Sequence, residues 1–163
     1  MDAADNQAGN ETGSRHQWNS PGDSAAVIER MNARRPGFLD LLCGHVAAVD
    51  HREASCTMHF EISRDYCHSV DIIQGGFVTA MLDAAMSHAA FALVPGVSNV
   101  ATLEIKVSFL EPSRAGRYHA VGFIDRAGRS TGFMSGKLFT ADGRLTATAT
   151  TTARLVRARG GEA

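Results

Sequence analysis

One carboxylate stands alone in the most apolar stretch of the sequence. Asp83 is the only formally charged side chain between Ile72 and Leu103. Because burying an unpaired charge costs free energy, such an aspartate is either paired elsewhere in the fold or kept for chemistry. An ionised carboxylate can take a proton from water or attack an electrophilic carbon itself. Asp83 is therefore the first candidate for a catalytic group, with a structural ion pair as the alternative.

Polar side chains recur around Asp83 at helical spacing. Thr79, Asp83 and Ser87 follow one another at intervals of four residues, and His88 lies beside Ser87. Residues four apart share one face of a helix, so the spacing predicts a polar stripe. That stripe needs a polar cavity or a partner surface, although the hydroxyls of Thr79 and Ser87 could simply bond to helix carbonyls.

A single helix must hold these groups. Gly75-Gly76 opens it after Gln74, it runs to about Val94, and Pro95-Gly96 ends it. Alanine recurs throughout this segment, which leaves little side-chain bulk and lets a sheet wrap closely around the helix. We therefore expect the helix to be buried on most sides.

Strand-like segments lie on both sides of that helix in the sequence. Residues 45–63 predict a half-buried hairpin, because apolar residues alternate with polar ones there. A short amphipathic helix over residues 25–35, ended by Pro36-Gly37, precedes the hairpin. Four strand-like runs separated by turn signals follow the central helix, at about residues 100–111, 117–126, 131–140 and 145–156. This order predicts an α+β fold in which the helix packs on a curved sheet and the last four strands form an antiparallel meander.

Composition bounds the class of protein. A chain of 163 residues with 44% hydrophobic and 20% charged residues predicts one domain over residues 21–157, with a disordered polar tail over residues 1–20 and a flexible tail over residues 158–163. A net charge of −1 gives no case for binding nucleic acid or an anionic membrane, and no apolar run reaches the roughly 20 residues of a membrane span. Three cysteines without disulfide-type or metal-type spacing, and a start without signal-peptide features, predict free thiols and a cytoplasmic protein. The histidines also lack ligand spacing, so we expect no metal.

The sequence Gln74-Gly75-Gly76 with Asp83 behind it resembles the motif of the PaaI-like hotdog-fold acyl-CoA thioesterases. In that family a His-Gly-Gly sequence is followed by an acidic residue nine positions after the histidine, and then by a strand patterned Thr-x-x-Leu-x-Val-x-Phe-Leu. Residues Thr102–Leu110 and the Gly128-Arg129 hairpin extend the resemblance, which covers about residues 39–156. It implies a hotdog fold, in which a curved antiparallel sheet wraps a long central helix.

The resemblance assigns roles to individual residues. Asp83 falls on the acidic catalytic position, and Gly75 falls on the glycine whose backbone N–H stabilises the oxyanion at the start of the helix. Ser87 matches a position that often carries a hydroxyl near the attacking water. Gln74 stands where the family has histidine and His68 stands where it has Asn or Gln, so the two polar groups are exchanged. Gln74 or His68 is expected to orient the thioester carbonyl or the thiolate, with a helix cap as the alternative for Gln74 and a hydrogen-bonded loop histidine as the alternative for His68.

The same resemblance implies further contacts. Gly76 is a second N–H donor beside the oxyanion, and Asp71 adds a carboxylate where the family commonly has glycine. One predicted hairpin falls where related enzymes hold the phosphates of CoA, although a solvated turn would use the same residues, namely Arg129, Ser130 and Thr131. Soft and aromatic side chains of the helix could line an acyl pocket: Phe77, Met81, Met86 and Phe91.

The implied function is hydrolysis of an acyl-CoA thioester to a free acid and CoA. CoA is then part of the substrate, no separate cofactor is expected, and Asp83 acts as general base or as nucleophile. The alternative is a non-catalytic hotdog module that binds acyl-CoA, which the exchange of Gln74 and His68 keeps open. The family's architecture also implies a homodimer, extended to a tetramer as a dimer of dimers, with the polar stripe at a subunit boundary.

Overall fold

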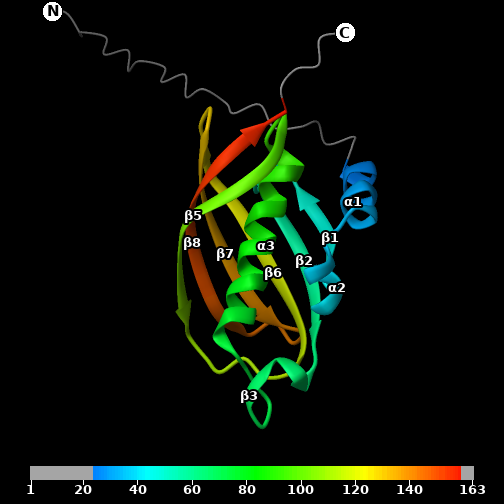
Figure 1. Ribbon diagram of the computed structural model, residues 1–163, viewed down its shortest axis with the longest axis vertical. Helices are drawn as coiled ribbons and strands as arrows, with labels where there is room; N and C mark the ends of the chain where they lie inside the picture. Colours follow the sequence, from blue (N-terminus) through cyan, green and yellow to red (C-terminus); the bar gives the residue numbers. More distant parts are fainter. Residues whose placement is uncertain (1–23, 159–163) are drawn as a thin grey trace, which may run out of the picture.

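Helix α3 (Gly75–Leu93) packs against the concave face of a six-stranded antiparallel sheet that curves around it (Figure 1). The computed structural model describes residues 24–158, so the tail predicted over residues 1–20, and all but the first residue of the tail predicted over residues 158–163, lie outside the described residues. The strands of the sheet are β1 (His45–Asp50), β2 (Ser55–Ile62), β5 (Val97–Phe109), β6 (Gly116–Ala127), β7 (Thr131–Thr140) and β8 (Leu145–Arg157). The smaller elements are α1 (Ser24–Ala33), α2 (Gly37–Leu41), the 3₁₀ turn η2 (Arg64–Tyr66), β3 (Cys67–Ser69) and β4 (Ile72–Ile73). This is the predicted α+β hotdog arrangement.

Two glycines on neighbouring strands let α3 approach the sheet closely. Gly122 of β6 pairs with Gly136 of β7. A Cβ atom at Gly122 would lie 2.3 Å from the carbonyl oxygen of Ala85, and one at Gly136 would lie 3.2 Å from the side chain of Met86. The small residues predicted for the helix therefore pack against a sheet surface on which two glycines leave room for the helix.

The hairpin predicted before α3 is confirmed. β1 and β2 pair antiparallel, and the four alternating apolar residues of β2 are buried: Cys56, Met58, Phe60 and Ile62. α1 also forms as predicted, with Val27 buried against the core. The sequence did not predict α2, whose five residues follow directly after Pro36. So short a helix carries too little periodicity to be recognised in a sequence.

The strand order differs from the predicted meander. β6, β7 and β8 are consecutive neighbours, but the sheet order is β1-β2-β6-β7-β8-β5. β5 therefore pairs with β8 at the edge of the sheet, and β6 pairs with β2 in the middle. The link between β5 and β6, residues 110–115, is a crossover segment that passes the N-terminal end of α3 (Figure 1). The prediction was wrong because order in the sequence does not fix the order of strands in a sheet.

Hydrogen bonds tie the crossover segment to the residues that precede α3. The Ile73 N–H donates to the Ser113 carbonyl oxygen at 2.8 Å, and the Ala115 N–H donates to the Asp71 carbonyl oxygen at 2.8 Å. The side chain of Asp71 forms an ion pair with Arg114, with an N–O distance of 2.6 Å. The second carboxylate that the sequence placed near this turn is thus engaged in holding the crossover segment.

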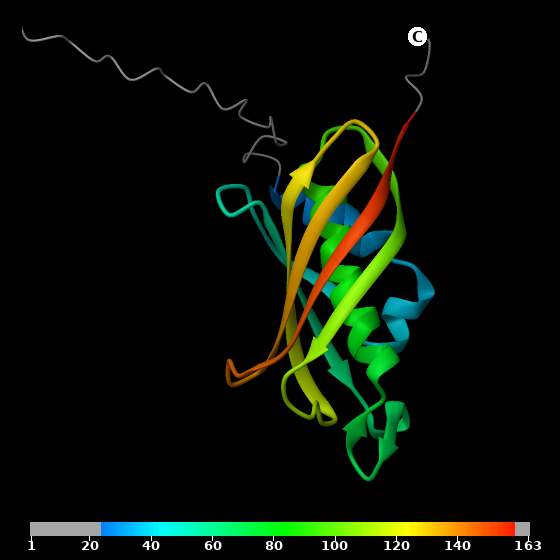
Figure 2. The ribbon, with the colours of Figure 1, turned by 90° about the vertical axis from the view of Figure 1, so that its left-hand side faces the viewer.

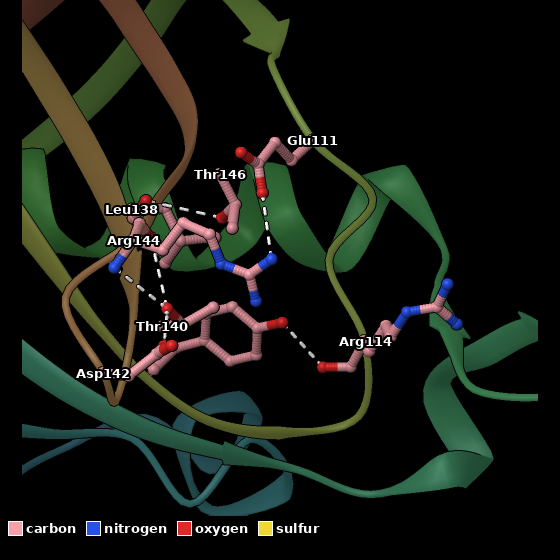
Figure 3. Close-up of polar contacts among 8 residues, drawn as sticks. Glu111, Arg114, Leu138, Thr140, Asp142, Arg144 and Thr146 are labelled. Carbon is pink, nitrogen blue, oxygen red and sulfur yellow. Dashed lines mark hydrogen bonds and ion pairs between the residues drawn. The ribbon is translucent and has the colours of Figure 1, made fainter.

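Side chains of the sheet fix the other side of the crossover segment (Figure 3). The Tyr118 hydroxyl donates to the Arg114 carbonyl oxygen at 2.6 Å, and the Arg144 guanidinium lies 3.2 Å from the Glu111 carboxylate. Arg144 is itself held in the β7–β8 turn, where its backbone N–H donates to the Thr140 hydroxyl at 3.1 Å. The crossover segment beside the start of α3 is therefore held on both sides by hydrogen bonds and ion pairs.

β5 is an edge strand that the fold leaves open. None of its 13 residues is buried, and Leu103 and Phe109 are 66% and 56% exposed. Within residues 24–158, no strand pairs with the side of β5 that faces away from β8. Figure 2 shows β5 along the border of the sheet, close to α3. An unpaired edge with exposed apolar side chains is typical of a surface that pairs with another chain.

α3 is nearly as long and as apolar as a membrane-spanning helix. By length and composition alone it could cross a membrane, but 61% of the qualifying window is buried inside the fold. A helix enclosed by a sheet needs the same apolar composition as a membrane span, so composition does not separate the two cases.

Candidate active site

Asp83 lies on the face of α3 that turns toward β5. Its side chain is half-buried, and one carboxylate oxygen accepts a hydrogen bond from the Thr102 hydroxyl at 2.8 Å. No lysine, arginine or histidine of residues 24–158 forms an ion pair with it. A neutral donor therefore holds the carboxylate, and its remaining lone pairs are free for a ligand. The described part of the chain gives no support to the alternative of a structural ion pair.

Asp83 lines a cavity of about 690 Å³, here called the Asp83 cavity, which lies between α3, β5 and the α1 region. Ser87 and Phe91 line the same cavity, each one helical turn further along α3. The volume is within the range of small-molecule sites, and both polar and aromatic groups face it. Thr79 does not line it, because its hydroxyl donates to the Gly75 carbonyl oxygen at 2.9 Å. Two of the three stripe residues thus face the predicted polar cavity.

His88 forms the inner wall of the Asp83 cavity. The ring is buried, and Nδ1 lies 2.8 Å from the Ala84 carbonyl oxygen. Because a carbonyl oxygen only accepts, Nδ1 carries the proton and Nε2 keeps a lone pair. Burial lowers the pKa of His88, against a smaller raising effect of the bond to Ala84, and thereby favours the neutral ring. Within residues 24–158, no group of three or more His, Cys, Asp or Glu side chains could hold a metal ion.

The start of α3 offers one free backbone donor. Gln74 is the N-cap residue, and its side-chain oxygen accepts a hydrogen bond from the Gly76 N–H at 2.6 Å. Gly76 was predicted to be a second free donor, but its N–H already donates to the Gln74 side chain. The Gly75 N–H has no hydrogen-bond partner within the described residues. Since N-terminal amides carry partial positive charge, this N–H can hold a developing oxyanion.

Gly75 faces a second cavity of about 420 Å³, here called the Gly75 cavity. His68 lines it as well, with Nδ1 at 2.8 Å from the Ser69 hydroxyl oxygen. The Phe109 ring lies over Gly75, since a Cβ added there would be 3.2 Å from the ring. The predicted pair of Gly75 and His68 is thus brought together at one cavity wall.

The two cavities separate residues that were predicted to act together. Asp83 and Ser87 line one cavity, whereas Gly75 and His68 line the other. Gly75 and Asp83 are eight positions apart on α3, which corresponds to a rise of about 12 Å. A carbonyl held at about 3 Å from the Gly75 N–H cannot also lie about 3 Å from that Asp83 carboxylate. Within one chain the two groups therefore cannot contact the same carbonyl.

Of the predicted CoA-phosphate residues, Arg129 and Ser130 lie in the exposed turn between β6 and β7 and Thr131 begins β7, and all three are outside both cavities. The carbonyl oxygen of Arg129 accepts a hydrogen bond from Arg157 at 3.1 Å, and Arg157 also donates to the Pro95 carbonyl oxygen. The turn with Ser130 and Thr131 is thereby tied to the residues just before β5, whose first positions line the Asp83 cavity. A contact of this turn with CoA stays a prediction.

Of the four helix residues expected to line an acyl pocket, only Phe91 faces the Asp83 cavity. Met81 and Met86 are fully buried in the core, and the Phe77 ring lies edge-on to Tyr66 with 4.7 Å between ring centroids. The helix period could have separated them, because Phe91 shares the face of Asp83 and Ser87 whereas the two methionines do not.

Two groups at the Asp83 cavity were not recognised from the sequence as site residues. Thr102 was noted only as part of a strand pattern, yet it holds Asp83. Arg30 and Arg34 of the α1 region line the cavity although they lie about 50 residues before Asp83 in the sequence. Arg30 lies in the last turn of α1 and Arg34 directly follows it, but nothing in the sequence says which element this end of the helix meets.

Comparison with known proteins identifies both a family and a fold. The thioesterase superfamily model matches residues 71–147. A phenylacetic acid degradation-related protein from Ralstonia eutropha JMP134 is 30% identical, with a TM-score of 0.71, and the match covers 79% of this chain and 99% of that one. The E. coli PaaI protein is 15% identical with a TM-score of 0.71, covering 81% of this chain and 93% of that one. A thioesterase from Haemophilus influenzae is 18% identical with a TM-score of 0.70, and the match covers 83% of this chain and 94% of that one. The last two likenesses concern the fold alone, and no curated protein matches the sequence significantly.

Proposed function

Since this chain belongs to the thioesterase superfamily, has the hotdog fold of its PaaI-like members and is thus a thioester hydrolase, we propose that its substrate is an acyl-CoA. The observation that carries the proposal is the state of Asp83. This carboxylate is half-buried, faces a cavity of ligand size and has only a hydroxyl as its partner in the described part of the chain. A group kept in this way is suited to accept a proton or to attack a carbon.

The proposed reaction needs an amide and a carboxylate on opposite sides of the thioester carbonyl. The Gly75 N–H polarises the carbonyl oxygen, and Asp83 takes a proton from water while the water oxygen bonds to the carbonyl carbon. In the second possible route, Asp83 attacks that carbon itself and water then hydrolyses the anhydride. In both routes the carbon–sulfur bond breaks, the sulfur leaves with a proton as the CoA thiol, and the acyl group leaves as the acid. Ser87 would position the water, and His68 would orient the carbonyl or the thiolate.

Gln74 takes a positioning role in this proposal. Its side chain caps α3 through Gly76, which keeps the neighbouring Gly75 N–H directed out of the helix. The family's histidine at this position is therefore replaced by a residue that shapes the oxyanion donor.

Two copies of the chain are needed to complete one site. The rise of about 12 Å between Gly75 and Asp83 is too long for one carbonyl, whereas Gly75 of one chain and Asp83 of a second copy can face each other across a two-fold axis. The open edge of β5, next to Asp83 through Thr102, is the surface available for such pairing. We propose a homodimer on this basis, with a tetramer as a dimer of dimers and the cytoplasm as the site of action.

The direct test compares wild type with Asp83→Asn. Release of free thiol is measured on a panel of aromatic and aliphatic acyl-CoAs, and loss of the base should lower kcat by about 10² to 10⁴. Asp125→Asn is the matched control, because Asp125 is an exposed carboxylate that also accepts a hydroxyl bond at 2.8 Å, from Ser135. Equal rates in wild type and Asp83→Asn would remove Asp83 from the mechanism. Binding of acyl-CoA without any release would favour the non-catalytic module.

The oxyanion donor can be deleted with little change in backbone geometry. Gly75 is the first helical residue, where proline is well tolerated, and Gln74 before it has φ −63° and ψ 134°, which suits a residue preceding proline. Gly75→Pro removes the N–H and should lower kcat by about 10² to 10³. Gly75→Ala keeps the N–H and serves as the control for the added carbon.

The shared site is tested by combining the two defects. Chains carrying Asp83→Asn and chains carrying Gly75→Pro are co-expressed, and the mixed dimer is purified by two tags. A mixed dimer has one intact site of two, made of Gly75 from the first chain and Asp83 from the second, so the purified mixed dimer should recover about half of wild-type activity. No recovery in a folded mixed dimer would contradict the shared site.

A further inference from the structure

The Asp83 cavity has an unusual balance of charge. Arg30, Arg34 and Arg35 line it, whereas Asp83 is the only carboxylate among its lining residues. Arg35 is partly neutralised, because its Nε lies 2.5 Å from the Asp40 carboxylate. Like charges that gather around one opening repel each other, so an anion placed there would be favourable.

Arg30 and Arg34 are the unneutralised part of this group. Neither forms an ion pair with a carboxylate anywhere in residues 24–158. Arg30 lies in the last turn of α1 and Arg34 is the first residue after that helix, and both line the Asp83 cavity. Basic residues also suit a helix C-terminus, which means that a purely structural role has to be separated by experiment.

α1 holds the two arginines at a fixed place. The side chain of Asn32 makes two hydrogen bonds with the backbone of Val46 in β1, at 2.9 and 2.8 Å, and Val27 is buried in the core. The lining of the cavity also includes apolar groups such as Met31 and Phe91. The cavity lining thus combines cationic groups, apolar groups and the candidate catalytic carboxylate.

We infer that Arg30 and Arg34 bind an anionic group of the thioester substrate while its reactive carbonyl lies at Asp83. This inference rests on the proposed function and specifies the substrate further. Guanidinium groups bind both phosphate and carboxylate oxygens through two hydrogen bonds, so the anion is either a phosphate of CoA or a carboxylate carried by the acyl group. The neutral part of the substrate then lies against the apolar groups of the lining.

The test uses the double variant Arg30→Gln/Arg34→Gln in the full-length protein. The control is Arg52→Gln, an exposed arginine in the β1–β2 turn that lines neither the Asp83 cavity nor the Gly75 cavity. The substrates are a neutral acyl group and its ω-carboxylated analogue, each presented as the CoA thioester and as the uncharged pantetheine thioester. KM should rise at least about 10-fold for the substrate that carries the recognised anion, while kcat stays within about two-fold.

The four substrates separate the two sources of the anion. A higher KM for both CoA thioesters but neither pantetheine thioester identifies a phosphate of CoA. A higher KM for both carboxylated substrates identifies the acyl carboxylate. A merely structural role would lower kcat and the melting temperature together without selecting among substrates, and that result would overturn the inference. Unchanged KM values on all four substrates would also overturn it.

The outcome stays separable from the proposed function. If wild type hydrolyses none of the four substrates, calorimetry with the same four compounds replaces the kinetic assay. Binding that the double variant weakens at least about 10-fold, selectively for the charged compounds, supports the arginine site although the hydrolase proposal fails. No binding of any of the compounds to wild type contradicts both proposals.

Discussion

Gly122→Ala should loosen the contact between α3 and the sheet, because the position has no space for a methyl group. The added Cβ would lie 2.3 Å from the carbonyl oxygen of Ala85 and 2.5 Å from the backbone nitrogen of Met86. Real Cβ atoms essentially never approach another heavy atom within 3.0 Å, so helix and strand must separate by at least the difference between 3.0 and 2.3 Å, about 0.7 Å. Both obstacles are backbone atoms, which cannot turn aside as a side chain could.

The size of the effect follows from the packing. Overfilling a core usually costs about 1–3 kcal/mol, and obstacles made of backbone put this site at the upper end, near 3 kcal/mol. Against a typical domain stability of about 5–15 kcal/mol this is a large fraction. For a chain of this size the melting temperature should fall by about 6–12 °C. Because α3 carries Asp83, a shift of the helix also lengthens the bond to Thr102 and should lower kcat in the folded fraction.

Urea denaturation followed by far-UV circular dichroism, at one fixed protein concentration, measures the change in the free energy of unfolding. Gly37→Ala is the matched control, because no heavy atom lies within 4 Å of a Cβ at that position. We expect the control to remain within about 0.5 kcal/mol of wild type. If Gly122→Ala were as stable as Gly37→Ala, the close approach of α3 to β6 would not exist in the protein.

Three further predictions concern single side chains. Thr102→Val removes the hydroxyl that donates to Asp83 and should lower kcat about 10-fold in initial-rate assays with little effect on stability, whereas an unchanged kcat would show that Asp83 needs no such support. Burial lowers the pKa of His88 below the usual 6.5, so the unfolded chain binds an extra proton as the pH falls below about 6.5, and the stability present above that pH is lost as the pH falls toward the folded pKa. His88→Gln should reduce this loss when the free energy of unfolding is measured by urea titration between about pH 5 and 7.5. An equal slope of the free energy of unfolding against pH in both proteins would refute this prediction. Burial raises the pKa of Cys56 to about 12, so a thiol reagent at about pH 8 should label the exposed Cys43 quickly and Cys56 only after unfolding, as peptide mass spectrometry would show.

The parts of the fold that repeat locally could be predicted from the sequence. β2 alternates apolar and polar residues, and this alternation alone decides which side chains enter the core. α3 is bounded by Gly75 and by the residues before Pro95, so its limits could be identified within one residue. The candidate carboxylate also stood out, because one charge in an apolar helix conflicts with its surroundings.

Contacts between distant segments could not be predicted in this way. The place of β5 beside β8 depends on a crossover segment whose hydrogen bonds are made to residues before α3. Thr102 reaches Asp83 only because β5 occupies that edge. In the same way, Arg30 faces the cavity only because α1 packs on β1 and α3. Periodicity describes one element at a time, whereas these contacts arise from the arrangement of several elements.

The position of Asp83 at the open edge of the sheet links the fold to the chemistry. Most of α3 is covered by β2, β6 and β7, where a carboxylate would lose its hydration without compensation. Toward β5 the cover is incomplete, since no residue of that strand is buried, so Asp83 stays partly hydrated in a single chain. A second copy placed against β5 would remove that water and bring a free Gly75 N–H to the substrate at the same moment. A carboxylate that is tolerated in the single chain would then act in a drier site, where electrostatic interactions with the developing charge are stronger.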